Sequence, residues 1–486
     1  MIWATAGAWG REAAGFAVFL VLARLLGPEA YGLVAMATVV IAVAQLLVAD
    51  VIQEPLIQRQ DLEPGHLDAA FWSLLALAVT LMLAAIAAAG PVAALFDQPE
   101  VATLILWLSA LPVLNALSAV PTALLRREMR YGFLAARSLF AVIGGGAVGI
   151  GMALAGQGAL SLVGHLLTQG IVSVLWLWMG SHWRPRLHCS RRHFRDLRTP
   201  GACMIGVRLV LLLQQQSPRV LIGYFLGPVA LGFYGVSWRV IEILYLLFIR
   251  PLSDVALPAF ARLQNDVERL REIHDTSRRL GAMIAMPTFI GLALVAPELI
   301  PATFGGQWSG AVPVVQALAI GGACMSIMSI SAMIPQALGR WDVTLVMRAL
   351  ATALTVAAIL SVREAGLVAI AAAVAAGEAM MILVTFDVIR RLTTEPMSEQ
   401  ALAYAPIATA GLIMAAAVFG WRQLMVDDLA HMTLLATSVI LGAAVYLAAL
   451  LVIALPLVHQ AWDLVSSVKQ GVFATPAPIK GSDTAG

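Results

Sequence analysis

The sequence predicts an all-α polytopic membrane protein with about fourteen transmembrane helices. Its 486 residues are 60% hydrophobic and only 12% charged, with a mean hydropathy of +0.88, so too little charge is present to cover the surface of a water-soluble chain. Apolar runs of about 20 residues, the length that crosses a bilayer, recur along the chain. Runs such as 74–89 and 349–360 do not alternate apolar and polar residues, which excludes a transmembrane β-barrel.

The predicted spans follow one another from the first residues almost to the end of the chain. They cover residues 3–25, 31–53, 69–89, 102–124, 138–155, 159–180, 201–225, 230–252, 280–300, 313–338, 349–362, 366–387, 401–420 and 433–455. With the N-terminus in the cytoplasm, only Arg363 and Arg422 of the 30 Lys and Arg residues fall in outward loops. Because cytoplasmic loops of membrane proteins are rich in Lys and Arg, this bias predicts that both termini are cytoplasmic.

A long internal repeat predicts how these spans are grouped. The heptad Leu26–Gly32 returns 200 residues later as Leu226–Gly232, each copy lying between two apolar runs. Three further matches follow in chain order: Pro55–Arg59 with Pro258–Arg262, Phe96 with Phe304, and Pro121–Arg126 with Pro335–Arg340. Six spans return a chain to the side where it began, so the two copies share one orientation. This pattern predicts two parallel-repeat six-helix bundles, over 1–180 and 201–390, as is typical of transporters.

The remaining segments predict connections, packing and two extra helices. Residues 181–200 form a basic cytoplasmic linker, which we interpret as an anchor at the anionic inner leaflet, with a substrate headgroup site as the alternative. Two additional transmembrane helices lie within 401–456, and 457–486 is a cytoplasmic tail. Clustered glycines at 144–151 predict close helix packing. Residues 262–279 predict a helix lying on the membrane surface, in which Asp275 and Arg279 can pair.

Charged and amide side chains inside the spans are the first candidates for function, because ionisable groups are costly within a membrane. At 100° per residue, Arg208, Gln215 and Arg219 share one stripe of the seventh span, roughly 16 Å long. Arg239 lies on the eighth span, where Glu242 is three residues away and can pair with it. We therefore predict a cationic substrate cavity that attracts an anion such as a phosphate.

The first span contributes Arg11 and Arg24 on the other side of the predicted cavity. The alternative for Arg24, Arg219 and Arg250 is snorkelling to the headgroups from near the span ends. Three acids are candidates for binding a coupling proton or Na⁺: Glu242, Asp50 and Glu378. A purely structural role for each of them stays open.

Motifs of soluble enzymes are missing from the sequence. It contains no GxxxxGK[ST], HExxH, GxSxG or CxxC motif. Its three cysteines are not spaced for a metal or placed for an extracytoplasmic disulfide. We therefore expect no enzyme activity, no cofactor, no metal and no nucleic-acid partner.

Three stretches resemble the polysaccharide transporter branch of the multidrug/oligosaccharidyl-lipid/polysaccharide (MOP) exporter superfamily, and within it the Wzx-type exporters. They are Ala23–Leu33, Leu257–Asp266 and Phe304–Leu318. The resemblance implies two six-helix bundles plus two helices in a bacterial inner membrane, with an Arg-rich central cavity. It also implies that an undecaprenyl-pyrophosphate-linked oligosaccharide is flipped by alternating access for surface polysaccharide biosynthesis. The implied partners are this lipid-linked oligosaccharide, membrane lipids, a polysaccharide polymerase and export machinery.

Two other functions are compatible with parts of the sequence. A cation or drug antiporter of the MATE type would share the fold but needs an acidic cavity, whereas the predicted stripe is basic. A membrane polysaccharide polymerase or ligase would need a large outward loop to hold the glycan, whereas predicted outward loops such as 90–101 and 301–312 are short. The basic stripe and the short loops favour the flippase.

Overall fold

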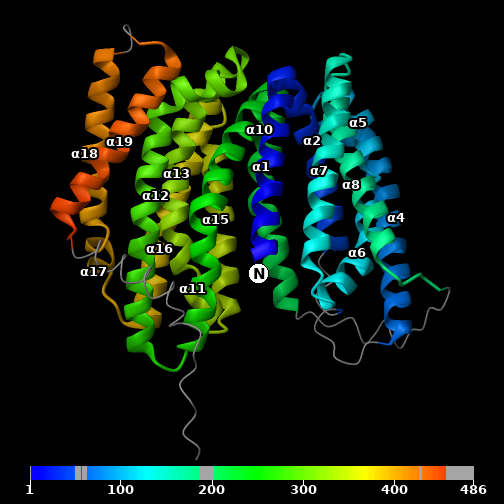
Figure 1. Cartoon of the computed structure of the whole chain (residues 1–486), viewed down its shortest axis with the longest axis horizontal. Helices are drawn as coiled ribbons and strands as arrows, with labels where there is room; N and C mark the ends of the chain where they lie inside the picture. The colour runs from blue at the N-terminus through cyan, green and yellow to red at the C-terminus, as the bar shows by residue number, and fades with distance from the viewer. Residues whose placement is uncertain (1, 50–55, 57–62, 187–201, 426–428, 456–486) are drawn as a thin grey trace, which may run out of the picture. The chain divides into compact units, whose positions relative to one another are not determined.

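The computed structural model describes residues 2–49, 56, 63–186, 202–425 and 429–455, and within them it contains helices and turns but no strand (Figure 1). The all-α prediction is thus confirmed. The α-helices are α1 (Ile2–Leu25), α2 (Pro28–Ala49), α4 (Pro64–Leu95), α5 (Glu100–Leu108), α6 (Leu111–Arg127), α7 (Tyr131–Leu154), α8 (Leu160–Gly180), α10 (Ala202–Leu244), α11 (Arg250–Arg262), α12 (Val267–Phe304), α13 (Val312–Ser331), α14 (Met333–Ala337), α15 (Trp341–Ser361), α16 (Leu367–Thr393), α17 (Met397–Leu402), α18 (Ala405–Met425) and α19 (His431–Ile453). A π-helix (Tyr245–Ile249) precedes α11, and a 3₁₀-helix (Gly306–Ala311) precedes α13.

Eleven helical stretches in the described part are long and apolar enough to cross a membrane. They correspond to the predicted spans other than the first, seventh and eighth. Helix α1 and the two halves of α10 occupy those three positions. The chain is therefore a multi-pass helical membrane protein, and the count of fourteen spans stays a prediction.

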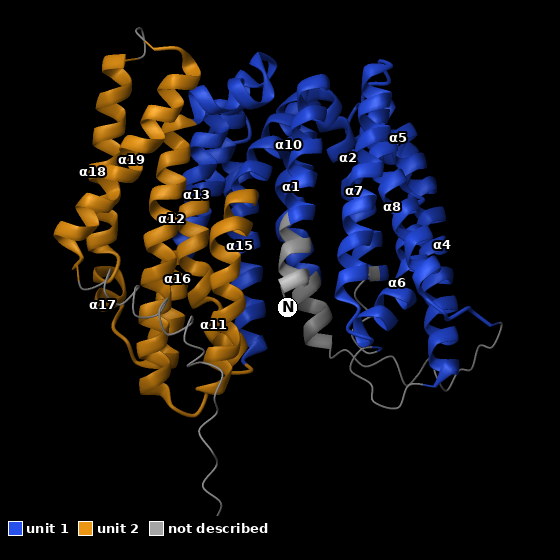
Figure 2. Cartoon of the chain, in the orientation of Figure 1, with its two compact units in different colours: residues 1–242, 296–321, 340–381 blue, residues 243–295, 322–339, 382–486 orange. Residues whose placement is uncertain are grey.

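The chain divides into two compact units (Figure 2). Unit 1 comprises residues 1–242, 296–321 and 340–381, and unit 2 comprises residues 243–295, 322–339 and 382–486. The boundaries between them cut through α10, near its C-terminal end, and through α12, α13 and α16. The predicted bundles 1–180 and 201–390 remain a prediction. Most of the predicted linker (187–200) and all of the predicted tail (457–486) lie outside the described residues.

The repeated heptad forms a helix break in both copies. In the first copy α1 ends at Leu25 and α2 begins at Pro28. In the second copy Gly227 interrupts α10 with φ 79° and ψ −174°, a conformation that glycine adopts without a steric penalty. Pro228 then starts the second half of α10, where its missing N–H costs nothing in a first helical turn.

The two breaks contact each other reciprocally within unit 1. A Cβ atom on Gly32 would collide with the backbone carbonyl of Pro228, and a Cβ atom on Gly232 would collide with that of Pro28. Each repeat therefore presents a glycine to the other repeat's proline, as in an isologous interface. This reciprocity supports the parallel two-fold relation that the repeat predicts.

A second matched pair of residues supports the same relation. Phe304, in the second repeat, packs edge-on against Phe19 of α1, with ring centroids 5.6 Å apart. Its first-repeat counterpart Phe96 lies against Gly223 of α10, where an added Cβ would sit 3.2 Å from the ring. Each phenylalanine thus packs on the first helix of the opposite repeat.

The predicted surface helix over 262–279 is wrong as a separate element. The structure continues α12 without interruption from Val267 to Phe304, so most of this segment forms the first turns of a 38-residue helix. The expected pair within it is present, because Arg279 Nη2 lies 2.7 Å from Asp275 Oδ2. Sequence periodicity identified the charged face but not its continuity with the following span.

We expect Gly32→Ala and Gly232→Ala to destabilise the folded chain to a similar extent, by about 1–3 kcal/mol, because each added methyl must displace backbone of the other repeat. Thermal unfolding of the purified protein in detergent measures the effect. Gly151→Ala is the matched control, since this exposed glycine of α7 has no heavy atom within 4 Å of an added Cβ. Wild-type stability in either of the first two variants would contradict the reciprocal contact.

Candidate functional site

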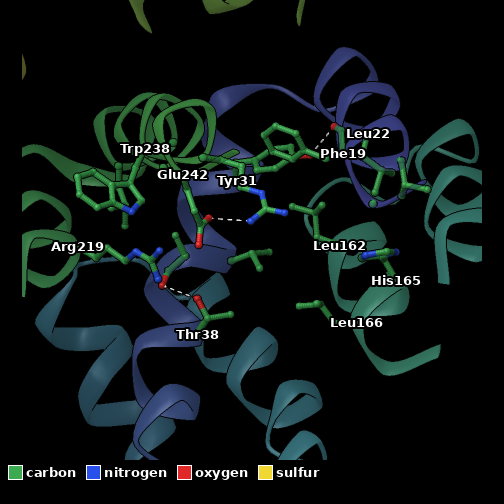
Figure 3. A pocket seen from close by; sticks show the side chains of 18 residues that line it. Phe19, Leu22, Tyr31, Thr38, Leu162, His165, Leu166, Arg219, Trp238 and Glu242 are labelled. Carbon is green, nitrogen blue, oxygen red and sulfur yellow. Dashed lines mark hydrogen bonds and ion pairs between the residues drawn. The ribbon is translucent and has the colours of Figure 1, made fainter. Parts of the chain in front are cut away.

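A cavity of about 300 Å³ lies in unit 1 among four helices (Figure 3). Helices α1, α2 and α8 supply mainly apolar and aromatic side chains, whereas α10 supplies the acidic and basic ones. The lining residues are Gly15, Val18, Phe19 and Leu22 of α1, Tyr31, Val34, Ala35 and Thr38 of α2, Leu162, His165 and Leu166 of α8, and Arg219, Leu231, Gly232, Gly235, Trp238, Arg239 and Glu242 of α10. The cavity is an apolar chamber whose charge is concentrated on one helix.

The lining follows the internal repeat. Phe19 and Arg219 lie 200 residues apart, at matching positions before the two turns, and Thr38 and Trp238 match in the same way after them. Equivalent faces of the two repeats therefore line one chamber. Their chemistry differs, because Arg219 is basic where its counterpart Phe19 is apolar, and Trp238 is aromatic where its counterpart Thr38 carries a hydroxyl.

Of the two arginines that line the cavity, Arg219 has fewer acidic neighbours to balance its charge. Its Nη1 lies 3.5 Å from Gln216 Oε1, and it makes no ion pair with any described residue. A central arginine costs roughly 2.5–3.5 kcal/mol on membrane-insertion scales. An unpaired arginine that lines a cavity is therefore a candidate for binding an anion.

Arg239 belongs to a chain of alternating charges between α1 and α10. Its Nη1 donates to Glu242 Oε2 at 2.7 Å, which confirms the predicted pair, and its Nη2 lies 3.9 Å from Glu12 Oε2. Arg11 Nη2 donates to Glu12 Oε1 at 2.7 Å. These ion pairs connect Arg11, one of the predicted site residues, to Arg239 through Glu12. Arg11 itself does not line the cavity.

Arg24, also a predicted site residue, lies outside the cavity and binds the end of another helix. Its Nε donates to the carbonyl oxygen of Thr303 at 2.7 Å, and its Nη2 donates to that of Ala302. Both carbonyls belong to the last turn of α12, where helix geometry leaves them without an intrahelical donor. Its guanidinium therefore caps α12.

Two residues that follow α12 donate hydrogen bonds to the last carbonyls of α1. Gln307 Nε2 donates to the carbonyls of Ala23 and Arg24 at 3.1 Å each, and Trp308 Nε1 donates to that of Ala23 at 2.8 Å. Trp308 is fully buried and packs edge-on against Tyr31, with ring centroids 5.6 Å apart. We call Arg24, Gln307 and Trp308 the clasp, because together they join the C-terminal ends of α1 and α12.

His165 is positioned by close packing of α7 against α8. A Cβ on Gly145 would lie 2.7 Å from the His165 carbonyl oxygen, and one on Gly149 would lie 2.8 Å from the His165 Cβ. The glycine cluster therefore allows the close approach that the sequence predicts. As a result, the imidazole lines the cavity opposite α10 (Figure 3).

The other predicted site residues are not brought into this cavity. Gln215 lies on α10 but is exposed and does not line the chamber. Arg208 also lies on α10, but its side chain is outside the described part, and Asp50 is outside the described residues altogether. Glu378, on α16, is half-buried and interacts electrostatically with Arg348.

The predicted spans leave out two arginines that lie within helices of membrane-spanning length. Arg137 donates to Thr122 Oγ1 at 3.4 Å, and Arg348 to Gln214 Oε1 at 3.5 Å. The predicted spans begin one residue after each arginine, whereas helices α7 and α15 begin about two turns earlier, at Tyr131 and Trp341. Because aromatic residues favour the membrane interface, starting each span at its aromatic residue would have included both arginines.

The two arginines and the apolar lining of the cavity suit a ligand in which a group with several negative charges is joined to a less polar group. Arg219 and Arg239 can each offer paired N–H groups to phosphate oxygens. The surrounding apolar walls strengthen such contacts because they exclude water. Tyr31 and Trp238 add aromatic faces to the chamber (Figure 3).

Comparison with known proteins identifies related sequences. A family profile described as "Polysaccharide biosynthesis protein" matches residues 21–313. The succinoglycan biosynthesis transport protein ExoT of Rhizobium meliloti is 28% identical over 318 residues, which cover 65% of this chain and 64% of ExoT. The lipopolysaccharide biosynthesis protein WzxC of Escherichia coli is 24% identical over 315 residues, 64% of each chain. The chain thus spans slightly less than two thirds of these relatives.

Solved structures share the fold. The lipid II flippase MurJ, in an inward closed conformation, superposes with a TM-score of 0.75 over 94% of this chain and 100% of MurJ, at 13% identity. An inward-facing MATE family multidrug transporter of the MOP superfamily gives a TM-score of 0.62 over 81% of this chain and 99% of its own, at 15% identity. At these identities the likeness shows that the chain shares its fold with these two proteins.

We expect Arg219→Gln to weaken binding of inorganic pyrophosphate to the purified chain by roughly tenfold or more, because one charge-assisted contact is lost. Isothermal titration calorimetry in detergent measures the affinity. Arg250→Gln is the control, since Arg250 pairs with Asp254 at 2.9 Å and does not line the cavity. Equal affinities in both variants would contradict an anion site at Arg219.

Proposed function

The chain belongs to the polysaccharide biosynthesis protein family, and we propose that it moves an undecaprenyl-pyrophosphate-linked oligosaccharide across the bacterial inner membrane. In this proposal the repeat unit passes from the inner to the outer leaflet and serves surface polysaccharide biosynthesis. The chain transports and does not catalyse a covalent step. The names of the relatives support this assignment, since they refer to transport for succinoglycan and to lipopolysaccharide biosynthesis.

The observation that carries the proposal is Arg219, which makes no ion pair with a described residue and lines a mainly apolar chamber together with Arg239. A pyrophosphate presents several anionic oxygens that two guanidinium groups can bind together. Aromatic faces such as Trp238 suit the flat apolar faces of sugar rings. A chamber of about 300 Å³ is too small for a whole glycan, so we propose that it receives the pyrophosphate and the sugar next to it.

We propose that transport occurs by alternating access, with both termini in the cytoplasm. Arg11 and Glu12 would take part by exchanging partners with Arg239 when the pyrophosphate enters. Glu242 and Glu378 are the described candidates for binding a coupling proton or Na⁺. A polymerase and export machinery would act on the product after it reaches the outer leaflet.

The antiporter alternative receives less support from the cavity. A site for organic cations needs an excess of carboxylates. Here Glu242 is the acidic lining residue, it is paired with Arg239 at 2.7 Å, and Arg219 adds a further positive charge. We therefore favour an anionic cargo.

Arg219→Ala and Arg239→Ala should each abolish surface polysaccharide while the membrane level of the protein persists, because the pyrophosphate loses a binding group. Polysaccharide staining and immunoblotting of the same cells measure the two quantities, and lipid-linked precursor should accumulate. Arg250→Ala, outside the cavity, should export normally. Normal polysaccharide in both cavity variants would overturn the assignment, and glycan elongation by the purified protein would replace it with an enzyme.

A further inference from the structure

A second cavity, of about 540 Å³, lies in unit 2. It is formed by the first turns of α12 and by the segment 395–406, which joins α16 to α18. Its walls are strongly charged, with five carboxylates and three guanidinium groups among the lining residues. This site shares no lining residue with the chamber of unit 1, so an inference about it is independent of the proposed transport.

The length of α12 places this cavity at the membrane surface. A helix of 38 residues is roughly 57 Å long, whereas the hydrocarbon core is about 30 Å thick. All acidic and basic residues of α12 except Glu298 fall between Glu268 and Arg279. The charged turns therefore project from the hydrocarbon into the headgroup region, and the cavity lies among them.

The floor of the cavity contains buried charges that satisfy one another only in part. Arg278, 1% exposed, donates from Nη2 to Asp275 Oδ1 and to Glu395 Oε1 at 2.5 Å each. Within the described structure, Arg278 Nη1 and Glu395 Oε2 are buried without a hydrogen-bond partner, and so is Arg279 Nε. Leaving such groups unpaired is costly, so a ligand that pairs with them is favoured.

These three atoms specify the chemistry of that ligand. The two guanidinium N–H groups require an acceptor, which a phosphate oxygen provides. The carboxylate oxygen of Glu395 requires a donor, and the excess of carboxylates favours a cation there. No group of three or more His, Cys, Asp or Glu side chains in the described residues is arranged to hold a metal ion, so the cation we consider is an organic ammonium. A zwitterion carrying both a phosphate and a primary ammonium therefore matches the cavity.

We propose that the cavity binds the headgroup of phosphatidylethanolamine. The phosphate accepts hydrogen bonds from Arg278 Nη1 and Arg279 Nε, and the ammonium donates to Glu395 Oε2. Leu402, at the edge of the cavity, is 68% exposed and offers an apolar surface to the acyl chains. Because the cavity lies at the end of the hydrocarbon core, the headgroups of the surrounding bilayer are at its level.

Native mass spectrometry of the full-length protein in detergent tests this assignment with short-chain phospholipids. We expect phosphatidylethanolamine to bind roughly tenfold more tightly than phosphatidylcholine, whose quaternary ammonium cannot donate a hydrogen bond, or phosphatidylglycerol, which has no cation. Equal binding of the three lipids would overturn the proposal. Free phosphoethanolamine binding as tightly as the lipid would also overturn it, because the occupant would then be a soluble molecule.

Two variants locate the binding within the chain. Glu395→Gln should abolish the preference for phosphatidylethanolamine, and Arg279→Gln, on a side chain that is 32% exposed and therefore safer for folding, should weaken binding of that lipid roughly tenfold. Arg340→Gln is the control, because Arg340 pairs with Asp342 at 3.1 Å in unit 1 and is exposed. Unchanged affinity for phosphatidylethanolamine in the Arg279 variant, or an unchanged lipid preference in the Glu395 variant, would assign the lipid to another surface and overturn the proposal.

Discussion

The reciprocal contact between the two Gly-Pro turns is the constraint on which the site in unit 1 depends. Gly32 accepts the backbone of Pro228, and Gly232 accepts the backbone of Pro28, so the turns approach more closely than any side chain would allow. This contact fixes α1 and α2 against both halves of α10. The chamber begins directly beside it, since Gly232 is one of the lining residues.

The fold repeats, but the chemistry does not. Matching positions of the two repeats line one chamber, but their side chains differ. Phe19 retains an apolar surface where its counterpart Arg219 carries a charge. A symmetric pair of arginines would repel each other across the two-fold axis and double the cost of burial in the membrane. With charge on one side, the chamber offers an anion a single face to bind, as the proposed function requires.

Sequence reasoning reached the architecture and part of the site because both depend on local patterns. Apolar runs predict spans, repeated turns predict the two-fold relation, and the spacing of Arg239 and Glu242 predicts a pair along one helix. The role of Arg24 could not be predicted in this way. Its acceptors are carbonyls of residues 302 and 303, and helical periodicity carries no information about which distant helix end a side chain meets.

The placement of the predicted span boundaries explains why two arginines were left out of the spans. Hydropathy marks where a helix becomes apolar, not where its first turn begins. Arg137 and Arg348 lie in that difference, inside the helix but before its apolar stretch. Arginine tolerates such positions because its long side chain can reach polar partners, as Arg137 reaches Thr122.

The clasp has a consequence for how firmly unit 1 is held together. Its hydrogen bonds run from side chains to backbone carbonyls, so they need neither ligand nor ion to form. The ring of Trp308 is fully buried and packs against Tyr31 of α2. The ends of α1 and α12 are therefore held together by contacts within the chain itself, so this part of unit 1 keeps its arrangement whether or not the neighbouring cavity is occupied.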